Sequence, residues 1–267
     1  MAARSLDPRL NLQATRKPNQ HGVVLKEIEV ERPPMIPSVH STLALPPGVV
    51  AKDVVMDKFT NTYLCSKPPQ NPPPKKKIFC SVNYPLAPDN RLPAAYDDGF
   101  KALMWVKQQA LNECGEQKWW LSKCSLSSLL IGGDSAVANI AYNVTTQLGS
   151  YDPSILRPLS LKGTARTWSE KCATQPLYSA LTLPNSNTYW RLSLPLRASI
   201  DHPRCNPLAK ASVAKLCDLS LPSMMVCVSE LDILKDRNFE LRRVEQHGEK
   251  GGNYNAQRSW TCIPSSA

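Results

Sequence analysis

The chain has 267 residues, enough for one large domain with a substantial core, and 42% of them are apolar. Its formal net charge is +10, but the one short basic run is Lys75-Lys76-Lys77 and no basic cluster is interleaved with aromatics, so no nucleic-acid partner is predicted. The nine cysteines lack C-x-x-C spacing, which argues against a disulfide framework and a metal site. No apolar run reaches the length of a membrane span, and the first 20 residues lack the apolar core of a signal peptide. We therefore predict a cytoplasmic protein with no membrane association.

The N-terminal third of the chain is rich in proline and contains most of its 24 prolines. Residues 1–20 are predicted to lack regular structure, and residues 1–48 as a whole to form an extended, Pro-rich region. A strand is predicted over 49–56. The stretch "SKPPQNPPPKKK", 66–77, has five Pro and four Lys, and its composition is typical of a polyproline-like linker or a surface loop.

From residue 78 onward, strand-like and helix-like segments alternate. A strand over 78–84 leads to a helix whose first turn holds Pro93 and whose buried face is predicted to be Phe100, Leu103, Met104, Val106 and Ala110. Further strands are predicted over 126–132, 159–164 and 222–232, and further helices over 136–148, 183–196 and 234–248. This alternation, with near-continuous apolar strands, predicts an α/β fold with a mostly parallel sheet, over residues 49–248. The tail, 249–267, is predicted to be irregular.

The strand over 126–132 runs into the tight sequence Gly132-Gly133-Asp134-Ser135 and then into a helix. A strand, a turn with Ser at its apex and a helix are the parts of a nucleophile elbow, whose signature is G-x-S-x-G. Here Val137 occupies the position of the second Gly. Such a turn would raise Ser135 above the sheet edge and place the backbone N–H of Ala136 as an oxyanion donor.

Several blocks in the same order resemble the plant carboxylesterases of the α/β-hydrolase fold, the family that includes the gibberellin receptors. They are "SVNYPLAPDNRLPAAYDDGFKALMWV" (81–106), "GGDSAVANIAYNV" (132–144), "DHPRCNPLA" (201–209) and "VCVSELDILKDRN" (226–238), with "RPPMIPS" and "GVVAKDVVMDKFTN" further upstream. The resemblance covers residues 28–240 with breaks. It implies a sheet flanked by helices and a serine hydrolase without a metal or cofactor.

The resemblance places the catalytic nucleophile on Ser135 and the catalytic acid on Asp232. A serine hydroxyl needs a histidine to take its proton, and that histidine needs a carboxylate to orient it. In this fold the acid follows the nucleophile, at the end of a later strand, and Asp232 has that position. The alternative reading of Asp232 is a helix cap, since a helix is predicted directly after it.

Three departures from the family predict impaired activity. The family's His-Gly-Gly oxyanion motif precedes the "SVNY" strand, where this chain has the Pro- and Lys-rich stretch 66–77. Val137 replaces the elbow Gly, and a β-branched residue there is expected to shift the turn or loosen the packing. The base must follow Asp232, and the histidine that does so is His247, at the end of the helix over 234–248. His247 is a candidate base whose alternative is a helix-end residue stabilised by the dipole. The final strand and its histidine are predicted to be missing.

Three readings of the function follow. The first is a carboxylic-ester hydrolase that acts on a small ester through Ser135, with impaired activity. The second is a non-catalytic, receptor-like relative that binds a small hydrophobic or acidic ligand. The third is a remnant that no longer folds into a stable domain, which a cooperative melt would rule out.

Overall fold

A computed structural model describes part of the chain. The described residues are 12–18, 24–30, 52–57, 62–67, 79–112, 121, 125–156, 161–166, 182–199, 201–206, 219, 221–222, 224–228, 233–236, 238–239 and 261–262. The chain divides into two compact units, Met1–His40 and Ser41–Ala267. The division falls close to the end of the predicted Pro-rich region, 1–48; the boundaries at 48 and 248 stay predictions.

The first unit holds an antiparallel hairpin of β1 (Leu12–Pro18) and β2 (Val24–Val30), with Leu12 opposite Val30 and Pro18 opposite Val24. The prediction that residues 1–20 lack regular structure is therefore wrong for Leu12–Pro18. The sequence of β1 has little strand propensity of its own, and its structure depends on pairing with the Val- and Ile-containing β2.

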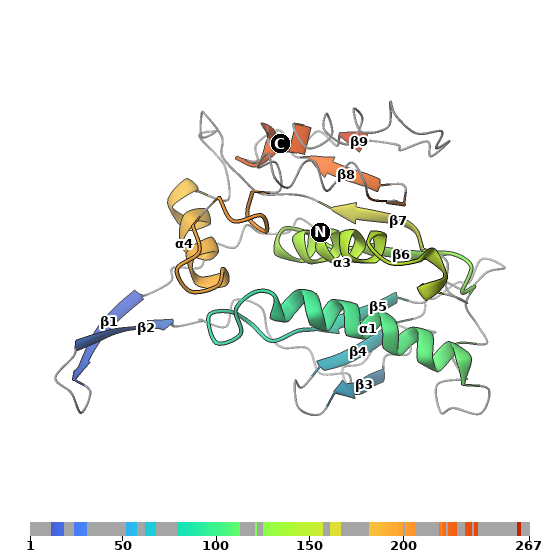
Figure 1. The fold of residues 1–267 in the computed structure, drawn as a ribbon, viewed down its shortest axis with the longest axis horizontal. Coiled ribbons are helices and arrows are strands. Elements are labelled where there is room, and N and C mark those ends of the chain that lie inside the picture. The colour runs from blue at the N-terminus through green and yellow to red at the C-terminus, as the bar shows by residue number, and fades with distance from the viewer. Residues whose placement is uncertain are drawn as a thin grey trace. The chain divides into compact units, whose positions relative to one another are not determined.

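An antiparallel sheet in the second unit has the order β3-β4-β5 (Figure 1). β3 (Lys52–Asp57) and β5 (Phe79–Asn83) match the strands predicted over 49–56 and 78–84. β4 (Thr62–Lys67) was not predicted, and its last two residues fall within the stretch predicted as a linker. Those residues are in the strand because they pair with the start of β5, Lys67 with Phe79 and Ser66 with Cys80.

The second sheet is parallel and confirms the predicted α/β architecture. Its order is β6-β7-β8-β9, formed by β6 (Leu129–Gly132), β7 (Leu161–Arg166), β8 (Met224–Val228) and β9 (Thr261–Cys262). The tail was predicted to contain no strand, yet β9 pairs with the end of β8, Thr261 with Cys227 and Cys262 with Val228. A two-residue strand is too short to give a periodic signal in the sequence. Among the described strands, no hydrogen-bonded pairing joins this sheet to β3-β4-β5.

Three α-helices lie where helices were predicted: α1 (Ala94–Leu111), α3 (Ala136–Gly149) and α4 (Leu183–Ser193). A short 3-10 helix, η1 (Pro153–Leu156), follows α3. Thr182 caps α4 by accepting a hydrogen bond from the Asn185 N–H at 3.4 Å, and α4 ends three residues before the predicted limit of 196. The end is set by Pro195, because the residue before a proline is disfavoured in helical conformation. Most of the helix predicted over 234–248 lies outside the described residues.

The main core forms between α1, α3 and β6, and α3 lies against β6 and β7 (Figure 1). Leu103, Val144 and Leu148 are buried at its centre. The predicted inner face of α1 is confirmed, because Phe100, Met104, Val106 and Ala110 all pack against this cluster.

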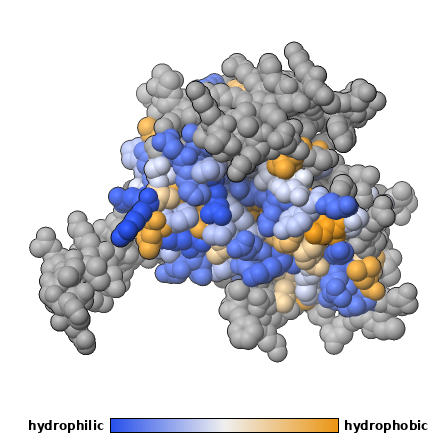
Figure 2. All heavy atoms as spheres, viewed as in Figure 1, coloured by the Kyte–Doolittle hydropathy of each residue, from blue (hydrophilic) through white to orange (hydrophobic). Residues whose placement is uncertain are grey.

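On the face seen in Figure 2, apolar side chains occur in small groups among polar ones. Within the described part of the chain, no helix combines the length and the apolar character needed to cross a bilayer.

Candidate active site

The turn between β6 and α3 holds Ser135 in a backbone conformation that L-residues rarely adopt. Its φ is 53° and its ψ is −120°, and it is one of two described non-glycine residues with positive φ, the other being Arg197. Such strain costs about 1–3 kcal/mol and is found at functional sites, where the surrounding structure enforces it. Ser135 directly precedes α3, and its side chain makes no capping hydrogen bond to that helix. This is the conformation expected of a nucleophile elbow.

Val137 lies close to Gly133 in this turn, and Ser135, between them in the sequence, has the backbone conformation of an elbow. A Cβ atom built on Gly133 would lie 2.5 Å from Val137 Cγ1 and 2.6 Å from the carbonyl carbon of Val137. The valine side chain therefore occupies space that the absence of a side chain at Gly133 leaves open. Val137 is 40% exposed. The helix approaches the end of β6 closely even though the second elbow glycine is absent.

The first turn of α3 leaves one backbone donor next to the serine. The N–H groups of Val137 and Ala138 both donate to the carbonyl of Asp134, at 3.0 and 3.4 Å, and the N–H of Asn139 donates to the carbonyl of Ser135 at 3.2 Å. In the described part of the structure, the N–H of Ala136 has no acceptor. An unpaired N–H at the positive end of a helix is suited to stabilise a developing oxyanion.

A buried hydrogen-bond network joins the first turns of α3 to α1 and to the segment 201–206. The Tyr96 hydroxyl of α1 donates to Asn139 Oδ1 at 2.5 Å, and Asn139 Nδ2 donates to the Arg204 carbonyl at 3.4 Å. The Arg204 guanidinium lies over the Tyr96 ring, 5.6 Å from its centroid. Burial raises the pKa of Tyr96 well above its ordinary value, because the phenolate would lose its hydration; the nearby Arg204 charge opposes this shift. Tyr96 is therefore a hydrogen-bond donor throughout the physiological pH range.

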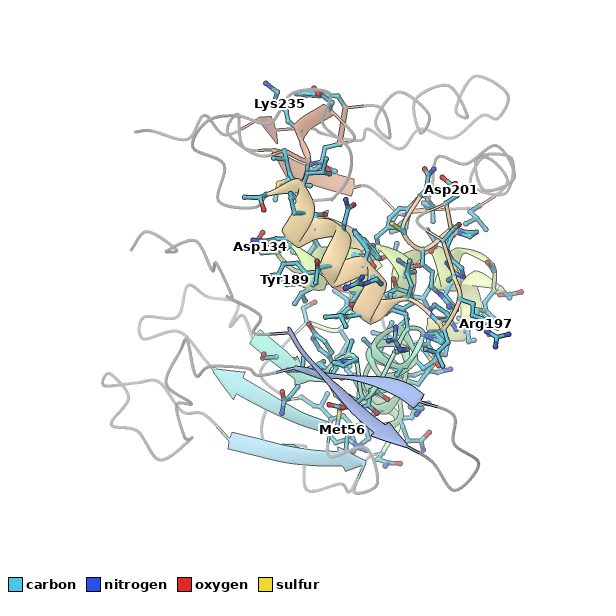
Figure 3. The ribbon with its side chains drawn as sticks, turned by 90° about the vertical axis from the view of Figure 1, so that its left-hand side faces the viewer. Met56, Asp134, Tyr189, Arg197, Asp201 and Lys235 are labelled. Carbon is cyan, nitrogen blue, oxygen red and sulfur yellow. The ribbon has the colours of Figure 1, made fainter. Side chains whose placement is uncertain are left out.

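His202 belongs to the segment 201–206, which supplies Arg204 to the network; Asp201 and Arg197 mark this part of the chain in Figure 3. The Nδ1 atom of His202 accepts a hydrogen bond from the Arg204 backbone N–H at 3.2 Å, and its carbonyl accepts from the N–H groups of Cys205 and Asn206, both at 2.8 Å. Partial burial, with a smaller contribution from the Arg204 charge, lowers the pKa of His202 below 6.5. His202 thus organises its own loop, which agrees with a structural role.

Of the predicted site residues, Ser135 and Ala136 are described by the structure, and Asp232 and His247 lie outside the described residues. β6, β7 and β8 are parallel, so their carboxyl ends share one edge of the sheet. Ser135 follows the end of β6 at that edge, and β8 ends there at Val228, four residues before Asp232 in the sequence. The roles of Asp232 as acid and of His247 as base stay predictions.

Sequence reasoning missed Tyr96 and Asn139. Asn139 is a polar residue on the buried side of a helix, with 7% of its surface exposed, and Tyr96 is 4% exposed. A buried polar residue needs hydrogen-bond partners, so an asparagine among the apolar positions of 136–148 was the available signal. No group of three or more His, Cys, Asp or Glu suited to hold a metal ion occurs among the residues that the structure describes.

Comparison with known proteins gives a consistent family. Residues 76–253 match the model of the alpha/beta hydrolase fold. The chain is 31% identical to probable carboxylesterase 6 of Arabidopsis thaliana over 278 residues, which covers 84% of this chain and 80% of that protein. It is 34% identical to 3-O-acetylpapaveroxine carboxylesterase CXE2 of Papaver somniferum, covering 70% of this chain and 63% of the relative. It is also 34% identical to gibberellin receptor GID1A of Arabidopsis thaliana, over 60% of this chain and 45% of the receptor.

Solved structures agree with this fold. Carboxyl esterase 2 of the fungus Tuber melanosporum superposes with a TM-score of 0.59 at 14% identity, over 86% of this chain and 81% of the esterase. An esterase of Rhizomucor miehei gives the same TM-score at 15% identity, over 82% of this chain and 74% of that one. At these identities the similarity shows a common fold.

Proposed function

Because the chain belongs to the carboxylesterase family of the α/β-hydrolase fold, we propose that it hydrolyses small carboxylic esters through Ser135, at a reduced rate. The observation that carries this proposal is the strained conformation of Ser135, with φ 53° and ψ −120°, directly before α3. A structural turn would not need a serine in a region that glycine adopts without strain.

The proposed reaction is acyl transfer followed by hydrolysis. In the first step, the Ser135 oxygen attacks the ester carbonyl and gives its proton to a base. The base returns this proton to the leaving alkoxide, which departs as an alcohol and leaves an acyl-serine. In the second step, a water molecule attacks the acyl-serine, releases the carboxylic acid and regenerates the serine. The N–H of Ala136, which has no acceptor among the described residues, supports stabilisation of the oxyanion in both steps. Asp232 is proposed as the acid of the triad, and His247 as the candidate base.

The reduced rate follows from the sequence. The stretch 66–77 replaces the segment where the family carries its His-Gly-Gly motif, and removing one oxyanion donor typically slows catalysis by about 10²–10³-fold. His247 follows Asp232 by 15 residues and belongs to the segment predicted as a helix. Loss of a triad member still leaves catalysis about 10³–10⁴-fold above water. We therefore propose slow but measurable turnover.

Hydrolysis of p-nitrophenyl acetate and butyrate by the purified chain tests this proposal. The expected result is a rate above that of buffer which Ser135→Ala abolishes and Asp232→Asn and His247→Gln each lower. Equal rates for wild type and Ser135→Ala would overturn the proposal. A normal rate in His247→Gln, with loss in Ser135→Ala, would keep the nucleophile and reject His247 as the base.

The second candidate function is binding of a small ligand without catalysis. The observation that favours it is the 34% identity to a gibberellin receptor, combined with the replaced oxyanion segment. The ligand would be a small hydrophobic or acidic molecule bound near the carboxyl edge of the parallel sheet. Hydrogen exchange of the Ser135 peptide with and without gibberellic acid distinguishes the two functions. Protection without hydrolysis would favour the receptor-like function, and unchanged exchange would remove it.

A further inference from the structure

Asn139 connects three segments that are distant in the sequence. Its backbone N–H is bonded to the carbonyl of Ser135, its side-chain oxygen to Tyr96 of α1, and its side-chain nitrogen to the carbonyl of Arg204. It lies one helical turn after the nucleophile, so any displacement of Asn139 moves the first turn of α3. The conformation of Ser135 is strained, and it therefore needs a support of this kind.

The hydrogen bonds of this network leave little room for substitution of Asn139. Asn139 Oδ1 also accepts from Asn143 Nδ2 at 3.3 Å, and Asn143 Nδ2 donates to the Asn139 carbonyl at 3.0 Å. Each side-chain polar atom of Asn139 thus has a partner in a buried site. Removing the Asn139 amide would leave the buried Tyr96 hydroxyl without its acceptor, whereas removing both groups at once costs less. Such a network fixes one position for the parts that it joins.

We infer that Asn139 is a positioning residue for the nucleophile, and that it holds the Ser135 turn in register with α1 and the segment 201–206. The inference rests on the proposed function for its catalytic consequence. Tyr96 acts through Asn139, and Arg204 completes the arrangement through its carbonyl and its contact with the Tyr96 ring. None of the three is proposed to touch the substrate.

Three variants test the inference through the rate at which a fluorophosphonate ester phosphonylates Ser135. In this step the serine oxygen bonds to phosphorus and displaces fluoride, and it serves as the measure of acylation. Tyr96→Phe removes the donor and keeps the ring, and Asn139→Leu removes the amide at similar volume. Each is expected to slow acylation about tenfold at saturating probe, because small misplacements of a reacting group are costly, with little change in the half-saturating probe concentration. The double variant is expected to be no slower than Asn139→Leu alone, because the two changes break one connection.

Two control variants on the same helix separate positioning from loss of stability. Thr146→Val removes a hydroxyl that donates to the Asn143 carbonyl at 3.0 Å and makes no bond to Asn139, Tyr96 or Arg204, and it is expected to leave the acylation rate within twofold of wild type. Leu148→Val weakens the core cluster at the far end of α3 and is expected to lower the melting temperature without the same loss of acylation. Equal effects of the network and core variants would overturn the inference.

Hydrogen exchange gives a second measurement that does not depend on activity. In Tyr96→Phe, the peptides that contain Ser135 and Arg204 are expected to exchange faster together, while peptides from the middle of α1 stay as in wild type. Unchanged exchange in both peptides would overturn the inference even in an inactive protein. Absence of acylation in wild type with coupled exchange would refute the proposed function and keep the positioning role. Normal acylation in all variants would refute the positioning role alone.

Discussion

Val137 occupies the space above Gly133, and the two residues together allow the elbow to close without its second glycine. A methyl group at Gly133 would meet Val137 Cγ1 at 2.5 Å and the Val137 carbonyl carbon at 2.6 Å. The second of these atoms belongs to the backbone of α3 and cannot move aside without displacing the helix.

Gly133→Ala is therefore expected to lower the free energy of unfolding by about 1–3 kcal/mol and to reduce reaction at Ser135. Gly99→Ala is the matched control, because its Cβ would meet only side-chain methyls, Val144 Cγ2 at 3.0 Å and Ile140 Cγ2 at 3.3 Å. It lies within a helix, where alanine is favoured over glycine. Urea denaturation of both variants checks this, and a larger loss in Gly99→Ala would contradict it.

The strain at Ser135 predicts that glycine there stabilises the protein. Ser135→Gly relieves the positive φ and is expected to raise the free energy of unfolding by about 1 kcal/mol, while it removes the nucleophile. Ser135→Ala also removes the nucleophile but keeps the Cβ and the strain. Denaturation curves of the two variants compare them directly. Equal stability of the glycine and alanine variants would show that the turn stores no strain.

Arg91 holds the end of α4 against the loop after β5. Its Nη1 donates to the carbonyls of Arg191 and Leu194, at 2.9 and 2.7 Å, and the neighbouring Leu92 N–H donates to the Ser193 carbonyl at 2.8 Å. Arg91→Ala is expected to lower the free energy of unfolding by about 2 kcal/mol, because the charged Arg91 side chain donates to two carbonyls at the end of a helix. Arg191→Ala removes the same charge from an exposed side chain and is expected to change stability by less than about 0.5 kcal/mol. Thermal melts of both variants test the difference.

His202 predicts a pH dependence of stability. Burial, with the Arg204 charge, lowers its pKa in the folded state below the unfolded value of 6.5, so the unfolded chain binds the proton more readily. The contribution of neutral His202 to the free energy of unfolding is therefore complete above about pH 6.5. It decreases as the pH drops through that value toward the pKa of the folded state. His202→Gln is expected to flatten this part of the profile between pH 7.5 and 5.5. An NMR titration of His202 with a midpoint above 6.5 would contradict the sign.

The parts of the fold that the sequence predicted are those with strong local signals. The alternation of strand and helix from residue 78 onward, and the apolar face of α1, are properties of short segments and were confirmed. β1, β4 and β9 were missed because each depends on pairing with another strand, and their own residues give little periodic signal.

In the candidate site too, local features could be predicted from the sequence and long-range contacts could not. The strand, turn and helix around Ser135 could be predicted because an apolar run, two glycines, a serine and a helical pattern follow one another in the sequence. The link from Asn139 to Tyr96 and Arg204 joins residues 43 and 65 positions apart, so no local pattern reveals it. The close approach of Val137 to Gly133 could not be predicted, because it depends on how the turn folds in three dimensions.

The most direct test of the account is labelling of the native chain with a fluorophosphonate ester, followed by mass spectrometry of the tryptic peptides. We expect one adduct, on Ser135, which forms in the folded protein, does not form when the chain is unfolded in urea before the probe is added, and is absent from Ser135→Ala. Labelling at other serines, or equal labelling of the folded and the unfolded chain, would contradict the assignment of Ser135 as an activated nucleophile.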